Sequence, residues 1–183
     1  MASAARTRRP ALRLSRLWQI ERPAERGSCY AAGEAAFHWL VEEERVPASK
    51  VILVGESMGG AVATELATHH VIGLLVLHGA FTSFPDMAQV RVPCYPSRYL
   101  VHNRMDNEAK IGHIHCPVFI SHGTADTVVP FSQGERLFAA AGEPKKFVRM
   151  EGHGHGPPNT ADFFETVRTF IMDTVRSEAP LPH

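Results

Sequence analysis

The chain has 183 residues, of which 44% are hydrophobic and 21% charged, and its 19 Lys and Arg residues balance 19 Asp and Glu residues. This length and composition predict one globular domain whose core needs neither disulfides nor a structural metal. Residues 1–27 carry a net charge of +5 and the remainder −5, so the globular part offers no basic face for nucleic acid. No apolar run approaches the roughly 18 residues that a membrane-spanning helix needs.

The first 28 residues are predicted to be a basic, poorly ordered leader, followed by a single domain over residues 29–177 and a tail over residues 178–183. Residues 1–18 combine Ala, Arg and Ser with no acid, which is also the composition of a mitochondrial transit peptide. The three cysteines are widely spaced and form no CxxC pair, which favours a reducing compartment. We therefore expect a cytoplasmic protein, with the mitochondrion as the alternative.

From residue 29 onward, short apolar runs alternate with helical patterns, which predicts an α/β fold with a mostly parallel sheet and flanking helices. Buried strands are expected at Val51–Val54, Leu74–Leu77, Val118–Ser121 and Lys146–Met150. Helices are expected at Tyr30–Arg45, Ala61–His69, Phe131–Ala141 and Thr160–Val175. The first strand is continuously apolar, as expected for a strand covered on both faces. Pro85, Pro93 and Pro96 predict that much of Thr82–Cys116 is irregular.

Directly after the first expected strand, the chain runs through Gly55-Glu56-Ser57-Met58-Gly59, a G-x-S-x-G motif between a strand and a helix. A serine on such a turn has a strained backbone and an exposed Oγ, and small neighbours are needed where strand and helix approach. The motif therefore predicts Ser57 as a nucleophile and the Met58 N–H as a donor to an oxyanion. An ordinary glycine-rich turn is the alternative.

A serine nucleophile needs an imidazole base, and that base needs a carboxylate to fix its tautomer. Asp126 follows the third expected strand, and the loop Glu151–Gly156 follows the fourth, so both reach the same edge of a parallel sheet. The loop holds His153 and His155, one of which is predicted to be the base. Two alternatives stay open: turn formation by Asp126, and metal binding by the histidine pair, although no acid or cysteine stands at a usual zinc spacing.

With serine, aspartate and histidine in this order, each after a successive strand, the chain from about Glu25 onward resembles the α/β-hydrolase superfamily. It looks most like the branch of depalmitoylase-like and serine-aminopeptidase-like hydrolases. The segments that carry the resemblance are Gly55–Gly60, Ala80–Ser83, Arg104–Asn107, His122–Asp126 with Val129-Pro130, and Glu151–Gly156.

The resemblance implies Ser57 as nucleophile, Asp126 as orienting acid and His155, which follows a G-x-G step, as base; His153 is the second choice. The implied activity is that of a serine hydrolase cleaving esters, thioesters or amides through an acyl-enzyme, without cofactor or metal. The expected partner is a small-molecule acyl substrate.

A complete member of the superfamily carries several strands before the helix expected at Tyr30, and a loop that supplies a second oxyanion amide. About 29 residues precede that helix here, so the resemblance implies a truncated fold. We expect Val51–Val54 to lack a partner strand on one side. This sheet edge is then expected to be covered by a second copy of the chain, which gives a homo-oligomer, or by irregular N-terminal residues. The alternative function is a weakly active or inactive module that binds or oligomerises.

The segment between the second and third strands is too short for a large separate lid, so an open site is expected. Its side chains Phe81, Phe84, Met87 and Tyr95 are predicted to form an acyl-binding wall. Ordinary core packing is the alternative for each of them.

Overall fold

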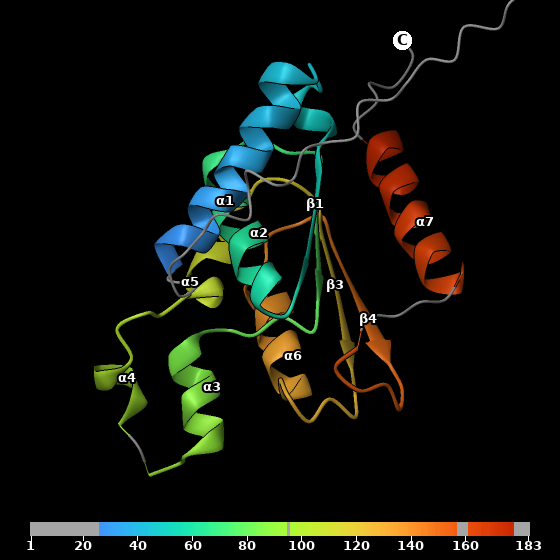
Figure 1. Ribbon diagram of the computed structural model, residues 1–183. Coiled ribbons are helices and arrows are strands. Elements are labelled where there is room, and N and C mark those ends of the chain that lie inside the picture. Colours follow the sequence, from blue (N-terminus) through green and yellow to red (C-terminus); the bar gives the residue numbers. More distant parts are fainter. Residues whose placement is uncertain (1–25, 95, 157–160, 178–183) are drawn as a thin grey trace, which may run out of the picture.

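The computed structural model describes residues 26–94, 96–156 and 161–177. Four parallel strands form one sheet in the order β1-β2-β3-β4. Their bounds are β1 (Ile52–Glu56), β2 (Leu74–His78), β3 (Val118–Gly123) and β4 (Lys145–Met150). Each strand lies within two residues of its predicted bounds, which confirms the predicted parallel sheet. Because all four strands run the same way, their carboxyl ends meet at one edge, the lower edge in Figure 1.

Helices cover both faces of this sheet (Figure 1), as predicted. One face carries α1 (Arg26–His38), α2 (Met58–His69), α5 (Asn107–Ile111) and α6 (Phe131–Ala140), and the other carries α7 (Ala161–Ser177). A π-helical turn (Trp39–Glu43) continues α1, and a 3-10 turn (Ala48–Lys50) precedes β1. Helix α1 begins two residues inside the predicted leader. Among the described residues, no helix combines the length and apolar character needed to cross a bilayer.

Much of residues 82–116 is irregular, as expected, but α3 (Phe84–Arg91), α4 (Ser97–Leu100) and α5 also lie in this segment. Helix α3 starts where Ser83 Oγ accepts a hydrogen bond from the Asp86 N–H at 3.2 Å. Pro85 occupies the first turn of this helix, where a backbone N–H has no helical partner to lose. A proline that argued against a helix therefore marks the start of one.

The core has two layers, one on each face of the sheet. Between the sheet and α2, α5 and α6, the fully buried large aliphatic side chains are Leu75, Leu77, Ile111, Val118, Ile120 and Leu137. On the opposite face, α7 packs Phe163, Val167, Phe170 and Ile171 against side chains of β2, β3 and β4. This second layer contains no side chain of β1.

Strand β1 is not covered on both faces as predicted. Ile52 and Val54 are 44% and 72% exposed, although their register partners Leu74 and Val76 on β2 are buried beneath α7. Among the described residues, no strand pairs with the outer edge of β1. β1, which begins with three apolar residues, thus forms the edge of the sheet within the part of the chain that the structure describes.

Two valines on one face of the sheet test this arrangement, because they are register partners that differ in burial. Val76→Ala, at a site 4% exposed, is expected to lower the free energy of unfolding by about 2 kcal/mol. The matched variant Val54→Ala is expected to change it by less than about 0.5 kcal/mol. Urea unfolding of both variants measures the difference. An equal loss from both would mean that Val54 is covered in solution.

Candidate active site

Ser57 lies between the end of β1 and the first residue of α2, in the turn that the G-x-S-x-G motif predicts. Its φ of 50° and ψ of −118° form a strained conformation for a residue with a side chain. The Ser57 N–H donates to His78 O on β2, and the Gly60 N–H donates to Ser57 O, both at 3.0 Å. Gly55 is required here because an added Cβ would lie 2.5 Å from Gly60 Cα. Backbone contacts with β2 and α2 therefore hold the serine in its strained state.

Met58 is the first residue of α2, so the helix starts three residues earlier than predicted. Backbone amides in the first turn of a helix have no carbonyl partner within that helix. The helix dipole also favours negative charge at this end. The Met58 N–H is thus available to an anion that forms beside Ser57.

Asp126 lies in the loop after β3, and its carboxylate is fully buried. Oδ1 accepts hydrogen bonds from the Val128 and Val129 backbone N–H groups, both at 2.8 Å, and Oδ2 lies 2.8 Å from Nδ1 of His155. Burial raises the pKa of Asp126, but the hydrogen bonds from His155 and the two amides outweigh burial and hold the pKa below its ordinary value. The carboxylate is therefore ionised and fixed in orientation.

Of the two histidines in the loop after β4, His155 contacts Asp126. A carboxylate can only accept, so Nδ1 of His155 carries the proton in this hydrogen bond and Nε2 is the nitrogen left for other contacts. His153 is exposed, and its Nδ1 donates to Glu151 O at 3.1 Å. The backbone O of His153 accepts from the Ala125 N–H at 2.9 Å, so His153 helps to join the loops after β3 and β4.

Gly79, the residue after β2, lies where these groups converge. It has a φ of +53°, and an added Cβ would lie 3.3 Å from Nδ1 of His155 and 3.6 Å from Oδ2 of Asp126. Its neighbour His78 accepts the Ser57 N–H, so all three candidate catalytic residues lie around the end of β2. Within the described residues, the Ser57 hydroxyl makes no hydrogen bond. Catalytic hydrogen bonds are often open in substrate-free enzymes.

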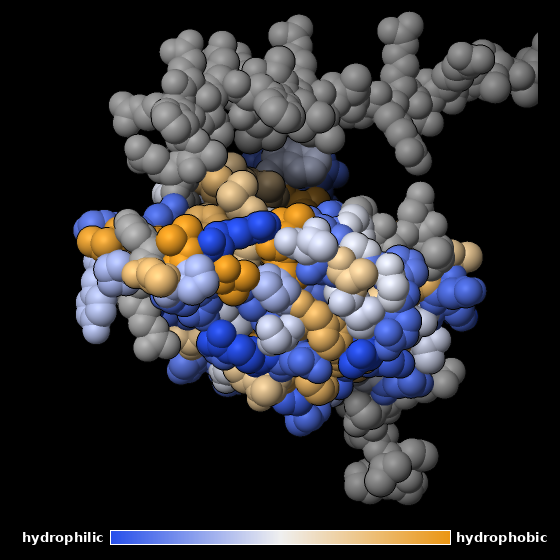
Figure 2. Space-filling view, turned by 90° about the horizontal axis from the view of Figure 1, so that it is seen from below, coloured by the Kyte–Doolittle hydropathy of each residue, from blue (hydrophilic) through white to orange (hydrophobic). Residues whose placement is uncertain are grey.

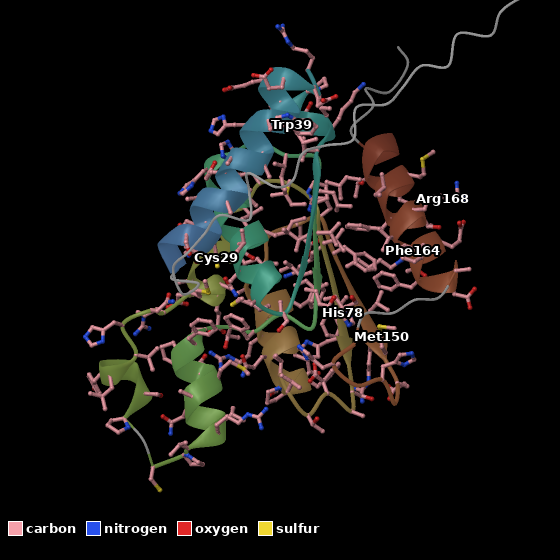
Figure 3. All side chains as sticks on the ribbon, viewed as in Figure 1. Cys29, Trp39, His78, Met150, Phe164 and Arg168 are labelled. Carbon is pink, nitrogen blue, oxygen red and sulfur yellow. The ribbon has the colours of Figure 1, made fainter. Side chains whose placement is uncertain are left out.

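His78 is a residue of this region that sequence reasoning missed. It is buried at the end of β2, where Nε2 donates to Gly156 O at 3.0 Å and Nδ1 accepts from Ser121 Oγ at 2.9 Å. Burial lowers the pKa of His78, which favours the neutral ring that this pair of bonds requires. Figure 3 shows it at the carboxyl ends of the strands. Because Gly156 follows His155, His78 anchors the loop that carries the candidate base.

His122 is a second buried imidazole beside Asp126. Its Nε2 donates to Val129 O at 3.0 Å and lies 3.3 Å from Asp126 Oδ2. An added Cβ on Gly134 would lie 2.5 Å from Nδ1 of His122, so α6 packs its glycine directly on this ring. The ring thereby supports the carboxylate and the turn that holds it.

The predicted acyl-binding wall is mainly core packing. Phe81 is 3% exposed and lies in a cluster with Ala61, Met105 and Val129. Phe84 and Met87 are half-buried against this cluster, and Tyr95 lies outside the described residues. Figure 2 looks on to the carboxyl ends of the strands, where apolar residues are interspersed with hydrophilic ones. Phe84 and Met87 therefore remain the candidates for contact with an acyl chain.

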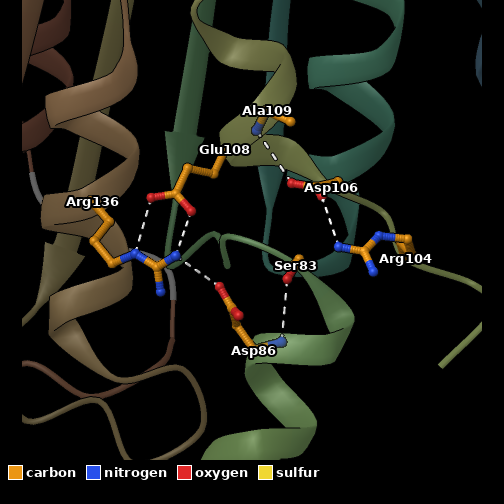
Figure 4. A pocket seen from close by; sticks show the side chains of 7 residues that line it. All are labelled: Ser83, Asp86, Arg104, Asp106, Glu108, Ala109 and Arg136. Carbon is orange, nitrogen blue, oxygen red and sulfur yellow. Dashed lines mark hydrogen bonds and ion pairs between the residues drawn. The ribbon is translucent and has the colours of Figure 1, made fainter. Parts of the chain in front are cut away.

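A charged pocket of about 380 Å³ lies among α3, α5 and α6 (Figure 4). Arg136 from α6 bridges Asp86 and Glu108, and Arg104 pairs with Asp106 at 3.3 Å. None of the three candidate catalytic residues lines this pocket. Carboxylates pair with both guanidinium groups. The ion pairs of Arg136 hold the segment between β2 and β3 against α6.

The depressed pKa of Asp126 predicts a specific loss of stability in acid. Its ionised carboxylate stabilises the fold above the ordinary carboxyl pKa near 4, and this contribution is lost as the pH falls through the lower folded-state value. We expect the wild type to lose more stability than Asp126→Asn below about pH 4.5. Urea unfolding at stepped pH measures this difference, and parallel curves for both proteins would contradict it.

Comparison with known proteins places the chain in a family. The model of the Dienelactone hydrolase family matches residues 14–167, beginning inside the predicted leader. An uncharacterized protein of Mycobacterium tuberculosis is 36% identical over 156 residues, which cover 84% of this chain and 55% of that protein. Alpha/beta hydrolase domain-containing protein 17B of Homo sapiens is 30% identical over 156 residues, 82% of this chain and 51% of that protein. The chain thus spans about half the length of these relatives.

The solved structures support the same fold. The esterase domain from a Rhodothermus marinus protein superposes with a TM-score of 0.61 at 23% identity, covering 80% of this chain and 68% of that one. At this identity the likeness concerns the fold alone. Together with the family match over most of the chain, it confirms the resemblance: the chain belongs to the dienelactone hydrolase family, within the α/β-hydrolase superfamily.

Proposed function

We propose that this protein is a serine hydrolase that cleaves carboxylic esters, thioesters or amides through an acyl-enzyme. The observation that carries the proposal is the 2.8 Å hydrogen bond between His155 and the buried Asp126, beside a serine with a strained backbone. Membership of a hydrolase family supports it. The esterase domain named among the structural neighbours makes esters the first substrates to test.

In the proposed reaction, Ser57 Oγ attacks the acyl carbon while its proton passes to Nε2 of His155. The ionised Asp126 stabilises the resulting imidazolium and keeps its ring in the required orientation. The Met58 N–H donates to the oxyanion. The tetrahedral intermediate then expels the alcohol, thiol or amine, which takes the proton from His155. Water, deprotonated by His155, releases the acid and restores the Ser57 hydroxyl.

The second candidate function is a weakly active or inactive module that binds or oligomerises. It is favoured by the outer edge of β1, with which no strand among the described residues pairs, and by the exposure of Ile52 and Val54. Pairing of this edge with a second copy of the chain is part of this alternative. The two candidates differ in whether Ser57 is activated.

Labelling with a fluorophosphonate probe tests the activated serine without knowledge of the substrate. We expect the probe to label the wild type, and Ser57→Ala to abolish both labelling and turnover of small activated esters. Ser132→Ala, which removes an exposed serine on α6, is the matched control and is expected to label fully. An unlabelled wild type, or a labelled Ser57→Ala variant, would contradict the proposal and favour the binding module.

The two histidines of the loop after β4 provide a second test. His155→Ala is expected to lower kcat/KM by about 10³ or more, because the nucleophile loses its base. His153→Ala is expected to stay within about threefold of wild type, since its ring contacts only the Glu151 carbonyl among the described residues. Steady-state kinetics measures both variants, and a larger loss from His153→Ala would reverse the assignment.

A further inference from the structure

A second group of chemically reactive side chains lies at the other end of α2 from Ser57. Glu34 and His38 stand one turn apart on α1, and His70 follows the last residue of α2. One ligand atom of each lies within 4.8 Å of the other two. Trp39, the neighbour of His38, lies at the end of the molecule opposite to His78 (Figure 3). This cluster is therefore separate from the candidate active site.

We propose that Glu34, His38 and His70 form a binding site for a divalent transition-metal ion, with zinc as the ion of choice. Two imidazole nitrogens and one carboxylate oxygen are a donor set that suits zinc. A water molecule completes a tetrahedral shell. The three ligands come from two helical elements, so the ion would tie α1 to the end of α2.

The distances need only small adjustments. Glu34 Oε2 lies 2.6 Å from Nε2 of His70 and 3.9 Å from Nε2 of His38. Ligand atoms around tetrahedral zinc, with bonds of about 2.0–2.2 Å, are about 3.4 Å apart. One of these contacts must therefore open and the other close by less than about 1 Å. The ligand atoms of His38 and His70, which lie within 4.8 Å of each other, must close by up to about 1.4 Å. These side chains are partly exposed, which leaves them free to make such shifts.

Neighbouring groups already orient the two histidines. Nδ1 of His38 lies 3.1 Å from Glu42 Oε1, so its Nε2 is the nitrogen that faces Glu34. A carboxylate behind the ligating imidazole is the arrangement that metal sites commonly use. Phe37 stacks on the His70 ring with centroids 4.0 Å apart and planes inclined by 25°.

Glu34 is ionised and accepts a hydrogen bond from His70, and a metal ion can replace the proton of this hydrogen bond. Burial raises its pKa, but hydrogen bonds from His70 and His69 outweigh burial and hold the pKa below its ordinary value. Since the carboxylate accepts, Nε2 of His70 carries the proton in this contact. A zinc ion would take the place of that proton and release it to solvent.

Zinc binding by the full chain, measured by competition with a chromophoric chelator, tests the proposal. We expect one zinc ion to bind per chain at this site. Glu34→Gln, His38→Ala and His70→Ala are each expected to weaken binding by about tenfold or more. Glu42→Gln, which removes only the carboxylate behind His38, is also expected to weaken it by about tenfold. Thermal unfolding without metal checks that each variant is folded.

His69→Ala is the matched control. His69 is as exposed as His38, and its Nδ1 lies 3.4 Å from Glu34 Oε1, yet it is outside the cluster of three. This variant is expected to bind zinc within about threefold of wild type. An equal loss from His69→Ala and His70→Ala, or unchanged binding by the three ligand variants, would overturn the assignment. Neither result bears on Ser57, so this test is independent of the proposed hydrolase activity.

Discussion

Parallel pairing of four strands is the constraint on which the rest of this structure depends. Parallel neighbours need a crossover, here helical, and they bring every strand's carboxyl end to one edge. Ser57, Asp126 and His155 are far apart in the chain, yet each follows a strand that ends at this edge. The site is therefore a consequence of strand direction, and the loops need only add short-range geometry.

That short-range geometry is set by hydrogen bonds whose donors and acceptors are unambiguous. Asp126 can only accept, so it determines which nitrogen of His155 carries the proton. The Gly156 carbonyl determines the tautomer of His78 in the same way. The Val129 carbonyl does so for His122. Three imidazoles near the strand ends thus have defined hydrogen-bond partners, and among the described residues Nε2 of His155 makes no hydrogen bond.

Helix α2 links the two ends of the molecule. Its N-terminus presents the Met58 amide beside Ser57, and the residue after its C-terminus is His70 of the proposed metal site. With 12 residues at about 1.5 Å each, the helix separates these two sites by roughly 18 Å. A metal ion at the far end would hold α1 against α2 without contacting the reacting atoms. The candidate active site and the proposed metal site therefore lie at opposite ends of one helix.

The sequence by itself determined the βα order, the serine turn and the aspartate and histidine loops. These features depend on local hydrophobic periodicity and on the positions of glycines. Both can be read directly from the sequence. The sequence misjudged Pro85, which starts a helix because Ser83 caps it. It left open whether Phe81 contacts a substrate or packs in the core, where the structure buries it. Both outcomes depend on neighbours that only folding supplies.

Only the tertiary structure decided which contacts form between distant residues. An all-apolar β1 predicts cover on both faces, but the position of α7 leaves Ile52 and Val54 exposed. No sequence motif marks His78, and its role depends on its hydrogen bond to the Gly156 carbonyl. Glu34 and His70 converge only because α1 packs on α2. Hydrophobic periodicity indicates which residues face a core. Contacts between distant residues depend instead on how helices and strands are placed in space, and no local sequence pattern contains that information.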